Sequence, residues 1–436
     1  MPLEATKQYH YAWVKVAGAH LSRCPGLIVF CAALSLGMCQ PAAAATLCVN
    51  PAGSGGCYST ISAAVAAAAN HDNIKVAPGT YKEDVVIGKP LSLIGANSSL
   101  TTIDATGLSN GIYIDGLDNP GLNGVLVTGF TVRNANFEGI LLTNTSASFV
   151  YNNRVLSNDK SLVIATPACP GQPSFETSES DDCGEGIHLV GTDHTTIADN
   201  FVEANSGGIL LTDETAVNQY NLISGNTVTQ NPYDCGITLA SHPPASGTVP
   251  FGIMHNTILN NVSSHNGIKV PGAGAGVGIF TFLPGGTVSG NVVVNNQLLS
   301  NGLPGVAFHS HGTGEVLNDN MIVGNTISGN GADTEDATTP GTTGINVFGV
   351  SPITGTIIAQ NVIDGEQDDI VVNTPTDVQA YLNNFDDAMF GVDNIGLGSA
   401  KAWENWWGCA GGADTTGCAM AGGPSVSFIP WLTAPF

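Results

Sequence analysis

A short phrase recurs along the chain between residues 111 and 350, and this repetition constrains the fold more than any other feature. Each copy begins with a glycine, followed by an apolar residue, any residue and another apolar residue. The glycines are Gly111, Gly139, Gly186, Gly208, Gly236, Gly276, Gly305 and Gly344. Period-two alternation indicates short strands, and repeats of roughly 22 to 40 residues are typical of stacked coils. The sequence therefore predicts an all-β solenoid, a single-stranded parallel β-helix.

Asparagines follow the strand phrases at regular places. We expect one corner of successive coils to hold Asn153, Asn200, Asn226, Asn256, Asn291, Asn325 and Asn361, and a second row to hold Asn158, Asn205, Asn231, Asn261, Asn296 and Asn330. Asparagine tolerates the left-handed turn conformation, and its amide can bond to the copies above and below it. These residues are therefore interpreted as structural ladders.

The N-terminus has the pattern of an export signal. Three basic residues precede an apolar stretch over 27–38, and small residues at Ala43 and Ala45 fit a signal peptidase site. We therefore predict a signal peptide over residues 1–45 and a secreted protein, periplasmic or extracellular. The apolar stretch is too short for a membrane span.

Cysteine use agrees with export to an oxidising compartment. Seven cysteines follow residue 45, and six of them form three close pairs in the sequence. The predicted disulfides are Cys48–Cys57, Cys169–Cys183 and Cys409–Cys418. Cys235 is left over and is interpreted as a small buried apolar residue.

The charge balance restricts the partners. Acidic residues number 35 against 11 basic ones, which gives a formal net charge of −24. Such a surface disfavours nucleic acid and anionic membranes. Contact with an acidic polysaccharide would need a bridging cation, so calcium is the one cofactor that the composition suggests. Acidic clusters at 176–185 and 364–369 could hold calcium or be solvated loops. We expect a monomer.

Two terminal segments resemble a known family. An alanine-rich helix is predicted over 60–70, and it is followed by Ala-Pro-Gly-Thr-Tyr at 77–81 and Leu-Ser-Leu-Ile-Gly at 91–95. This order resembles the opening of pectin-lyase-like right-handed parallel β-helices, in which the helix caps the core. The aromatic residues of 403–407 and 428–432 resemble the closing segment of secreted bacterial β-helix proteins. The resemblance implies a β-helix domain over 46–400 and an aromatic, disulfide-linked cap over 401–436.

The candidate site follows from counting along each strand. Positions two, four and six after the strand glycine should face outward, and stacking should align them between coils. This strip, with its adjoining loops, gathers imidazole, carboxylate and aromatic groups. The residues assigned to catalysis are Glu214, Tyr233, Asp234, His242, Lys269, His309 and His311, and those assigned to substrate binding are His188, Asp213, Phe280 and Phe282.

These groups suit chemistry on a uronic acid polymer. Lyases and C5-epimerases remove the proton at carbon five, which requires a base, a neutraliser for the carboxylate and an acid. His242 or Tyr233 could be the base, Lys269 or calcium the neutraliser, and His311 the acid. The segment 231–234, Asn-Pro-Tyr-Asp, resembles the Asp-Pro-His-Asp motif of mannuronan C5-epimerases at its proline and last aspartate.

Three alternatives stay open. Asp213 or Glu214 with Asp234 could hydrolyse a glycoside. The protein could be a non-catalytic glycan-binding or structural β-helix, with scattered and exposed histidines. It could also handle a metal ion through His242, His309 and His311. The enzymatic hypothesis predicts that His242→Ala and His311→Ala abolish activity and leave the melting temperature nearly unchanged.

Overall fold

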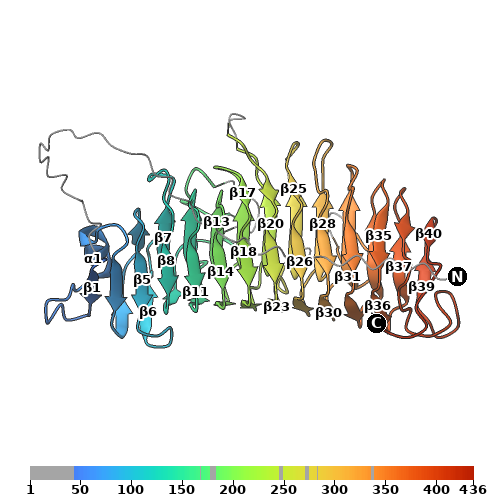
Figure 1. The fold of residues 1–436 in the computed structure, drawn as a ribbon, viewed down its shortest axis with the longest axis horizontal. Helices are drawn as coiled ribbons and strands as arrows, with labels where there is room; N and C mark the ends of the chain where they lie inside the picture. The colour runs from blue at the N-terminus through green and yellow to red at the C-terminus, as the bar shows by residue number, and fades with distance from the viewer. Residues whose placement is uncertain are drawn as a thin grey trace, which may run out of the picture. The chain divides into compact units, whose positions relative to one another are not determined.

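The computed structural model describes residues 44–166, 168–176, 183–244, 249–270, 274–281, 283–334 and 338–436. The predicted signal peptide falls almost wholly outside these residues. A compact unit spans Ala44–Phe436, and its strands stack in chain order, as the colour sequence in Figure 1 shows. Within the described residues, the strands form three long parallel sheets and one small sheet, so the predicted all-β solenoid is confirmed.

The largest sheet has 14 strands over the described residues. In order they are β1 (Thr46–Val49), β2 (Asn73–Val76), β5 (Ser92–Gly95), β8 (Leu126–Thr128), β11 (Phe149–Tyr151), β14 (Thr196–Ala198), β18 (Leu222–Ser224), β22 (Thr257–Leu259), β26 (Val292–Val294), β29 (Met321–Val323), β32 (Ile357–Ala359), β35 (Val378–Tyr381), β38 (Ala400–Lys401) and β40 (Val426–Ser427).

A sheet of 11 strands, again counted over the residues described, follows it in the coils between the two ends. It contains β3 (Gly79–Tyr81), β6 (Thr101–Asp104), β9 (Thr131–Arg133), β12 (Arg154–Leu156), β15 (Phe201–Glu203), β19 (Thr227–Thr229), β23 (Val262–Ser264), β27 (Gln297–Leu299), β30 (Thr326–Ser328), β33 (Val362–Asp364) and β36 (Asn384–Asp386). A small sheet pairs β17 (Asn218–Gln219), β21 (Ile253–Met254) and β25 (Val288–Ser289).

The 12-stranded sheet carries the strand-glycine phrases; its strands are likewise counted within the described ranges. They are β4 (Val85–Ile87), β7 (Ile112–Asp115), β10 (Ile140–Thr143), β13 (Ile187–Val190), β16 (Ile209–Thr212), β20 (Ile237–Ser241), β24 (Val277–Thr281), β28 (Val306–Ser310), β31 (Thr343–Gly349), β34 (Asp368–Asn373), β37 (Phe390–Asn394) and β39 (Met420–Gly422).

The register of this sheet follows the strand glycines. The residue after each glycine pairs with its counterpart in the next coil, from Ile112 and Ile140 to Val306 and Ile345. The copy at Gly276, in which a second glycine stands at the middle position, fits the same register. Apolar side chains one and three residues after the glycine are buried in the continuous core. Glycine is required here because a Cβ at Gly208 would lie 2.1 Å from the carbonyl oxygen of Gly236 in the next coil.

The asparagine ladders form, but their predicted alignment is wrong in one part. Asn226 donates its side-chain amide to Asn261, not to the expected Asn256. Asn256 instead belongs to a ladder that begins at Asn221. In these coils an asparagine recurs every five residues. An alignment that is shifted by one corner therefore still pairs asparagine with asparagine. The ladder step from Asn221 to Asn256 spans 35 residues, whereas the step from Asn200 to Asn226 spans 26, and this longer coil conceals the correct alignment.

The termini of the core are closed by short segments. The helix α1 (Ile61–Ala67) begins after Thr60, whose side chain accepts the N–H of Ala63, and it buries its apolar face. It is shorter than predicted because Ala68 is already extended. At the other end, β39 and β40 add to two sheets, so residues 401–436 continue the stack. The ring of Trp407 is fully buried there against Phe385 and Phe428.

The three predicted disulfides are present: Cys48–Cys57, Cys169–Cys183 and Cys409–Cys418. Cys235 is a free, buried thiol whose sulfur accepts the N–H of Ala275. Among the described residues, no helix is long and apolar enough to cross a membrane. The Cys169–Cys183 disulfide ties together the first insertion, which spans residues 160–185 and comes before β13.

Candidate functional site

The outer face of the 12-stranded sheet is mostly covered. Side chains two residues after the strand glycine were expected to face solvent, but they are buried at Leu141, His188, Leu210, Thr238, Ala307 and Asn346. Residues that precede the strand glycines pack on this face: Cys235, Ala275 and Leu303 cluster with Ala307, and Asp333 accepts a hydrogen bond from Asn346. The predicted outward strip is therefore largely removed from water.

His242 and Glu214 form a buried pair at the ends of β20 and β16. The Nδ1 atom of His242 lies 3.1 Å from Oε1 of Glu214, and His242 is 1% exposed. Burial raises the pKa of Glu214, but the hydrogen bond and charge of His242, together with His188 and Thr212, outweigh burial and lower it overall. The predicted alignment of these two residues is thus present, and both side chains are buried.

Asp213, next to Glu214 in the sequence, links three segments of the chain by hydrogen bonds. Its carboxylate accepts hydrogen bonds from the Ser241 hydroxyl at 2.8 Å, from the N–H of His242 at 2.6 Å and from the N–H of Gly252 at 2.7 Å. Burial raises the pKa of Asp213 to about 6 despite these bonds. Since its side chain is enclosed, the assignment of Asp213 to substrate binding is not supported by its position. Its contacts are those of a structural residue.

His188 lies on β13 beneath the first insertion. Its Nε2 atom is 2.9 Å from the hydroxyl of Thr212, and burial lowers the pKa of His188 to about 4. Its imidazole is therefore neutral at pH 7. Glu138 and Glu176 are also buried here, and one ligand atom from each of these three residues lies within 4.8 Å of the others. Burial and the charge of Glu138 raise the pKa of Glu176 well above its usual value.

His309 on β28 pairs with an aspartate from an insertion. Its Nε2 atom lies 2.5 Å from Oδ2 of Asp333, which precedes β31 in the segment 332–343. The side-chain amide of Asn346 donates to the same oxygen at 3.1 Å. The backbone N–H of Asp333 donates in turn to Thr339. The carboxylate is thereby fixed beside the imidazole.

Aromatic rings surround this imidazole. The ring of Phe280 lies 4.8 Å from that of His309, and the ring of Phe348 lies 6.3 Å from it. His311 packs edge-on at 5.6 Å and is exposed, with Nδ1 2.9 Å from the carbonyl oxygen of Thr281. Phe280 and Phe348 are half-buried. We refer to Phe280, His309, His311 and Phe348 as the imidazole–aromatic patch.

Three predicted residues lie on loops. The exposed ammonium of Lys269 lies 5.6 Å from the centre of the Tyr233 ring. Asp234 is half-buried, and its Oδ1 accepts the N–H of Cys235 at 2.6 Å. Asn231, which begins the epimerase-like segment, is part of an asparagine ladder. Phe282 lies outside the described residues.

The predicted site thus separates into distinct groups. Glu214 and His242 form one pair, His309 and His311 belong to the imidazole–aromatic patch, and Tyr233 and Lys269 form a loop contact. His242 and His311 end strands two coils apart, which corresponds to about 10 Å at the usual strand spacing. Among the described residues, His242, His309 and His311 do not bring their ligand atoms within 4.8 Å of one another, so the chelating set is not formed.

Sequence reasoning missed Glu138, Asp333 and Phe348 as members of these groups. Glu138 precedes its strand glycine directly, as Glu185 does in the next coil, and this repeated position was an available signal. Phe348 occupies the same register as His309 on the neighbouring strand. Asp333 carries no such signal, since its place depends on the path of an insertion.

The second acidic cluster, residues 364–369, contains a deeply buried carboxylate. Asp369 is wholly buried, and no hydrogen-bond partner reaches either of its oxygens. Burial raises its pKa well above the usual value, and the charge of Glu366 raises it further. One oxygen of Glu366 accepts the last bond of an asparagine ladder, from Asn330. This cluster is therefore partly an extension of the ladder rather than a solvated loop.

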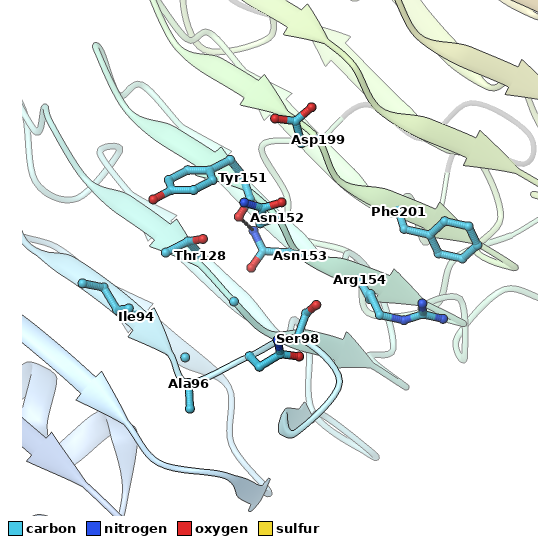
Figure 2. Close-up of a pocket in the computed structure, with 13 residues that line it drawn as sticks. Ile94, Ala96, Ser98, Thr128, Tyr151, Asn152, Asn153, Arg154, Asp199 and Phe201 are labelled. Carbon is cyan, nitrogen blue, oxygen red and sulfur yellow. Dashed lines mark hydrogen bonds between the residues drawn. The ribbon is translucent and has the colours of Figure 1, made fainter.

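A hollow lies on a different part of the molecule, beside the corner between the 14- and 11-stranded sheets. Figure 2 shows Tyr151, Asn152, Arg154, Asp199 and Phe201 around it. The guanidinium of Arg154 lies 4.8 Å from the centre of the Phe201 ring. None of the predicted site residues lines this hollow.

Two family models match the chain. One, described as "Right handed beta helix region", matches residues 93–246, and one described as "Periplasmic copper-binding protein (NosD)" matches residues 172–366. The protein has the fold of a right-handed parallel β-helix, the fold of the pectin-lyase-like proteins that its terminal segments resemble. No curated protein matches the sequence.

Solved structures show the same fold. The A-module of the mannuronan C-5 epimerase AlgE6 from Azotobacter vinelandii is 15% identical with a TM-score of 0.55, and the match covers 86% of this chain and 94% of that one. An alginate lyase from Paenibacillus sp. is 14% identical, with a TM-score of 0.40 and coverage of 68% and 92%. The catalytic unit of an alpha-1,3-glucanase from Streptomyces thermodiastaticus is 16% identical, with a TM-score of 0.43 and coverage of 91% and 70%. The fold is thus shared with the epimerase module.

Proposed function

We propose that this is a secreted protein that binds an acidic polysaccharide at the imidazole–aromatic patch and acts on it as a lyase or C5-epimerase. The observation that carries the proposal is the His309–Asp333 pair beside two aromatic rings and a second, exposed histidine. Three disulfides support an extracytoplasmic location. The fold shared with the epimerase supports the substrate class only at the level of architecture.

His309 is the proposed base in place of His242. We assign Nε2–H of His309 as the donor to the carboxylate of Asp333, so that Nδ1 is the proposed proton acceptor. Asp333 is in turn held by Asn346. An imidazole that a carboxylate orients in this way is a common general base. His242 is less suited because it is enclosed with Glu214.

The rest of the patch supplies binding and proton donation. Half-buried aromatic rings such as Phe280 and Phe348 can stack on the apolar faces of sugars. His311 is exposed next to His309, and it is the proposed acid for the leaving oxygen. The substrate carboxylate needs a cation, because the chain carries a formal charge of −24. A bound calcium ion is proposed for that role, since Lys269 lies in the separate contact with Tyr233.

A screen of the purified chain against uronic and neutral glycans tests this proposal. A lyase yields an unsaturated product that absorbs ultraviolet light, and an epimerase changes the NMR signals of the uronate without releasing ends. His309→Ala and His311→Ala should each remove the activity, whereas His265→Ala, at an exposed turn, should retain it. Equal activity of His309→Ala and the unaltered chain would refute the proposal.

The same screen decides between the enzyme and a glycan-binding protein. Retention on an immobilised uronate polymer without any product would indicate binding alone. The shielding of His309, which is 6% exposed, is the observation that favours this second function. Loss of retention in Phe348→Ala would place the binding at the patch.

A further inference from the structure

We propose that Glu138, Glu176 and His188 bind one divalent first-row transition metal ion. One ligand atom from each residue lies within 4.8 Å of the other two, and all three side chains are buried. Within the ranges that the structure describes, this is the only such group of three His, Cys, Asp or Glu residues. The site lies apart from the imidazole–aromatic patch, and the inference does not depend on the proposed function.

The hydrogen bonds around His188 leave one nitrogen available for a metal ion. The hydroxyl of Thr212 donates to Glu214 and lies 2.9 Å from Nε2 of His188. Since a hydroxyl has a single proton, Thr212 must accept the Nε2–H of His188. Nδ1 therefore carries a lone pair, and it is buried without a hydrogen-bond partner. A second-sphere bond that fixes the tautomer in this way is typical of metal-binding histidines.

The negative charges of the carboxylates at the site also favour a bound cation. Two carboxylates, Glu138 and Glu176, are buried close together, and Glu214 acts on Glu176 as a further negative charge. Among the groups that act on Glu176, no basic side chain offsets this charge. Burying like charges is unfavourable unless a proton or a cation compensates them. A divalent ion would neutralise both ligand carboxylates at once.

The three ligands come from separate parts of the fold. Glu138 precedes β10 and His188 lies on β13, two strands that pair directly. Glu176 belongs to the first insertion, which the Cys169–Cys183 disulfide closes. A bound ion would therefore fasten the insertion onto the outer face of the 12-stranded sheet.

The donor set selects the class of metal. An imidazole with two carboxylates suits Zn²⁺, Mn²⁺ or other first-row ions, and the affinity should follow the order Mn²⁺ below Zn²⁺ below Cu²⁺. Calcium prefers six to eight oxygen ligands and no imidazole, so it should bind most weakly. Three protein ligands leave at least one position for water, as open zinc sites do.

Metal content and thermal stability test the proposal. The tag-free chain is loaded separately with Zn²⁺, Mn²⁺, Cu²⁺ and Ca²⁺, dialysed, and measured by elemental analysis and thermal denaturation. We expect about one Zn²⁺ per chain and a higher melting temperature, because an ion that binds only the folded state stabilises it. Glu176→Gln and His188→Gln should each weaken Zn²⁺ binding at least tenfold.

Two control variants separate this site from general ion uptake. Glu366→Gln alters a buried carboxylate elsewhere, and His194→Gln alters an exposed imidazole. Both should bind Zn²⁺ like the unaltered chain. If Glu176→Gln does not fold, Glu138→Gln and His188→Gln still test the site. The proposal is overturned if the unaltered chain binds no Zn²⁺ at millimolar concentration, or if these variants bind it equally well.

Discussion

Nε2 of His309 lies 2.5 Å from Oδ2 of Asp333, which joins the 12-stranded sheet to a residue of an insertion 24 positions later. This contact sets the tautomer of the imidazole and holds the insertion at the edge of the patch. It is the relationship on which the proposed chemistry depends most directly. The two residues are far apart in the sequence, so only folding brings them into contact.

Replacing the carboxylate of Asp333 by an amide should lower the turnover rate strongly and the free energy of unfolding only slightly. In Asp333→Asn the amide cannot balance an imidazolium, and we expect turnover on a uronate substrate to fall by roughly 10²-fold or more, as is common when general-base catalysis is impaired. The pH–rate profile should shift as well. The measurement is kcat against pH for this variant and for Asp387→Asn, an exposed aspartate away from the patch. Unchanged kcat and pH profile in Asp333→Asn would contradict the assignment.

The buried His242–Glu214 pair should matter for stability. Glu214→Ala leaves His242 enclosed without this partner, and His242→Ala leaves the carboxylate buried. Breaking a buried pair from one side costs about 3–5 kcal/mol. Both variants should therefore unfold at lower urea concentration, contrary to the expectation from sequence that His242→Ala leaves stability unchanged. For the exposed His311 that expectation still applies, and His311→Ala is the matched control.

The carboxylate of Asp369 should make stability depend on pH. Its pKa is raised by burial and then by the charges of Glu366, Asp386, Asp364 and Asp368. A raised carboxyl pKa favours the folded state below the unfolded value and loses that contribution as the pH rises through the folded value. Asp369→Asn should therefore raise the melting temperature at pH 7.5 and change it much less near pH 4.

Thermal denaturation of Asp369→Asn and the unaltered chain across pH 4 to 8 checks this expectation. At neutral pH the variant should be the more stable chain, because an amide at this position avoids the cost of ionising a buried carboxyl. The difference between the two chains isolates Asp369 from other titrating groups. A constant difference at all pH values would show that its ionisation is not responsible.

The ladders should contribute strongly to stability. The side-chain amide of Asn226 donates to the carbonyl of Ile197 and to Asn261, and its oxygen accepts from Asn200. Asn226→Ala leaves these buried groups without partners, so a loss of roughly 2–5 kcal/mol is expected, since each such group costs about 1–3 kcal/mol. Chemical denaturation measures the loss. Asn123→Ala, at an exposed turn, should cause little change.

Much of the architecture could be predicted because it depends on local repetition. The strand glycines and the alternating apolar residues specify coils that stack in register, and all eight phrases align as expected. The disulfide pairs follow from close spacing in the sequence. The sequence predicts asparagine ladders, but not which asparagines pair, because the five-residue period places an asparagine at each of the neighbouring corners. Asn256 and Asn261 are thus equivalent locally, and only the stacked coils distinguish them.

The candidate site was predictable only where it follows the strand register. Stacking alone places Glu214 beside His242 and places Phe280 and His309 on adjacent strands. The partners Asp333 and Glu176 come from insertions. The path of an insertion cannot be predicted from the repeat, because insertions lack its periodicity. The burial of the outer strip likewise depends on those insertions.

The sequence by itself determined the solenoid, the register of its strand glycines and its disulfides. The first two arise from short-range patterns repeated from coil to coil, and the disulfides join cysteines that are close in the sequence. The tertiary structure alone decided which polar side chains are enclosed, which carboxylate orients His309 and which residues converge on His188. Those contacts join segments of different coils, and their geometry depends on how irregular loops pack against a regular sheet.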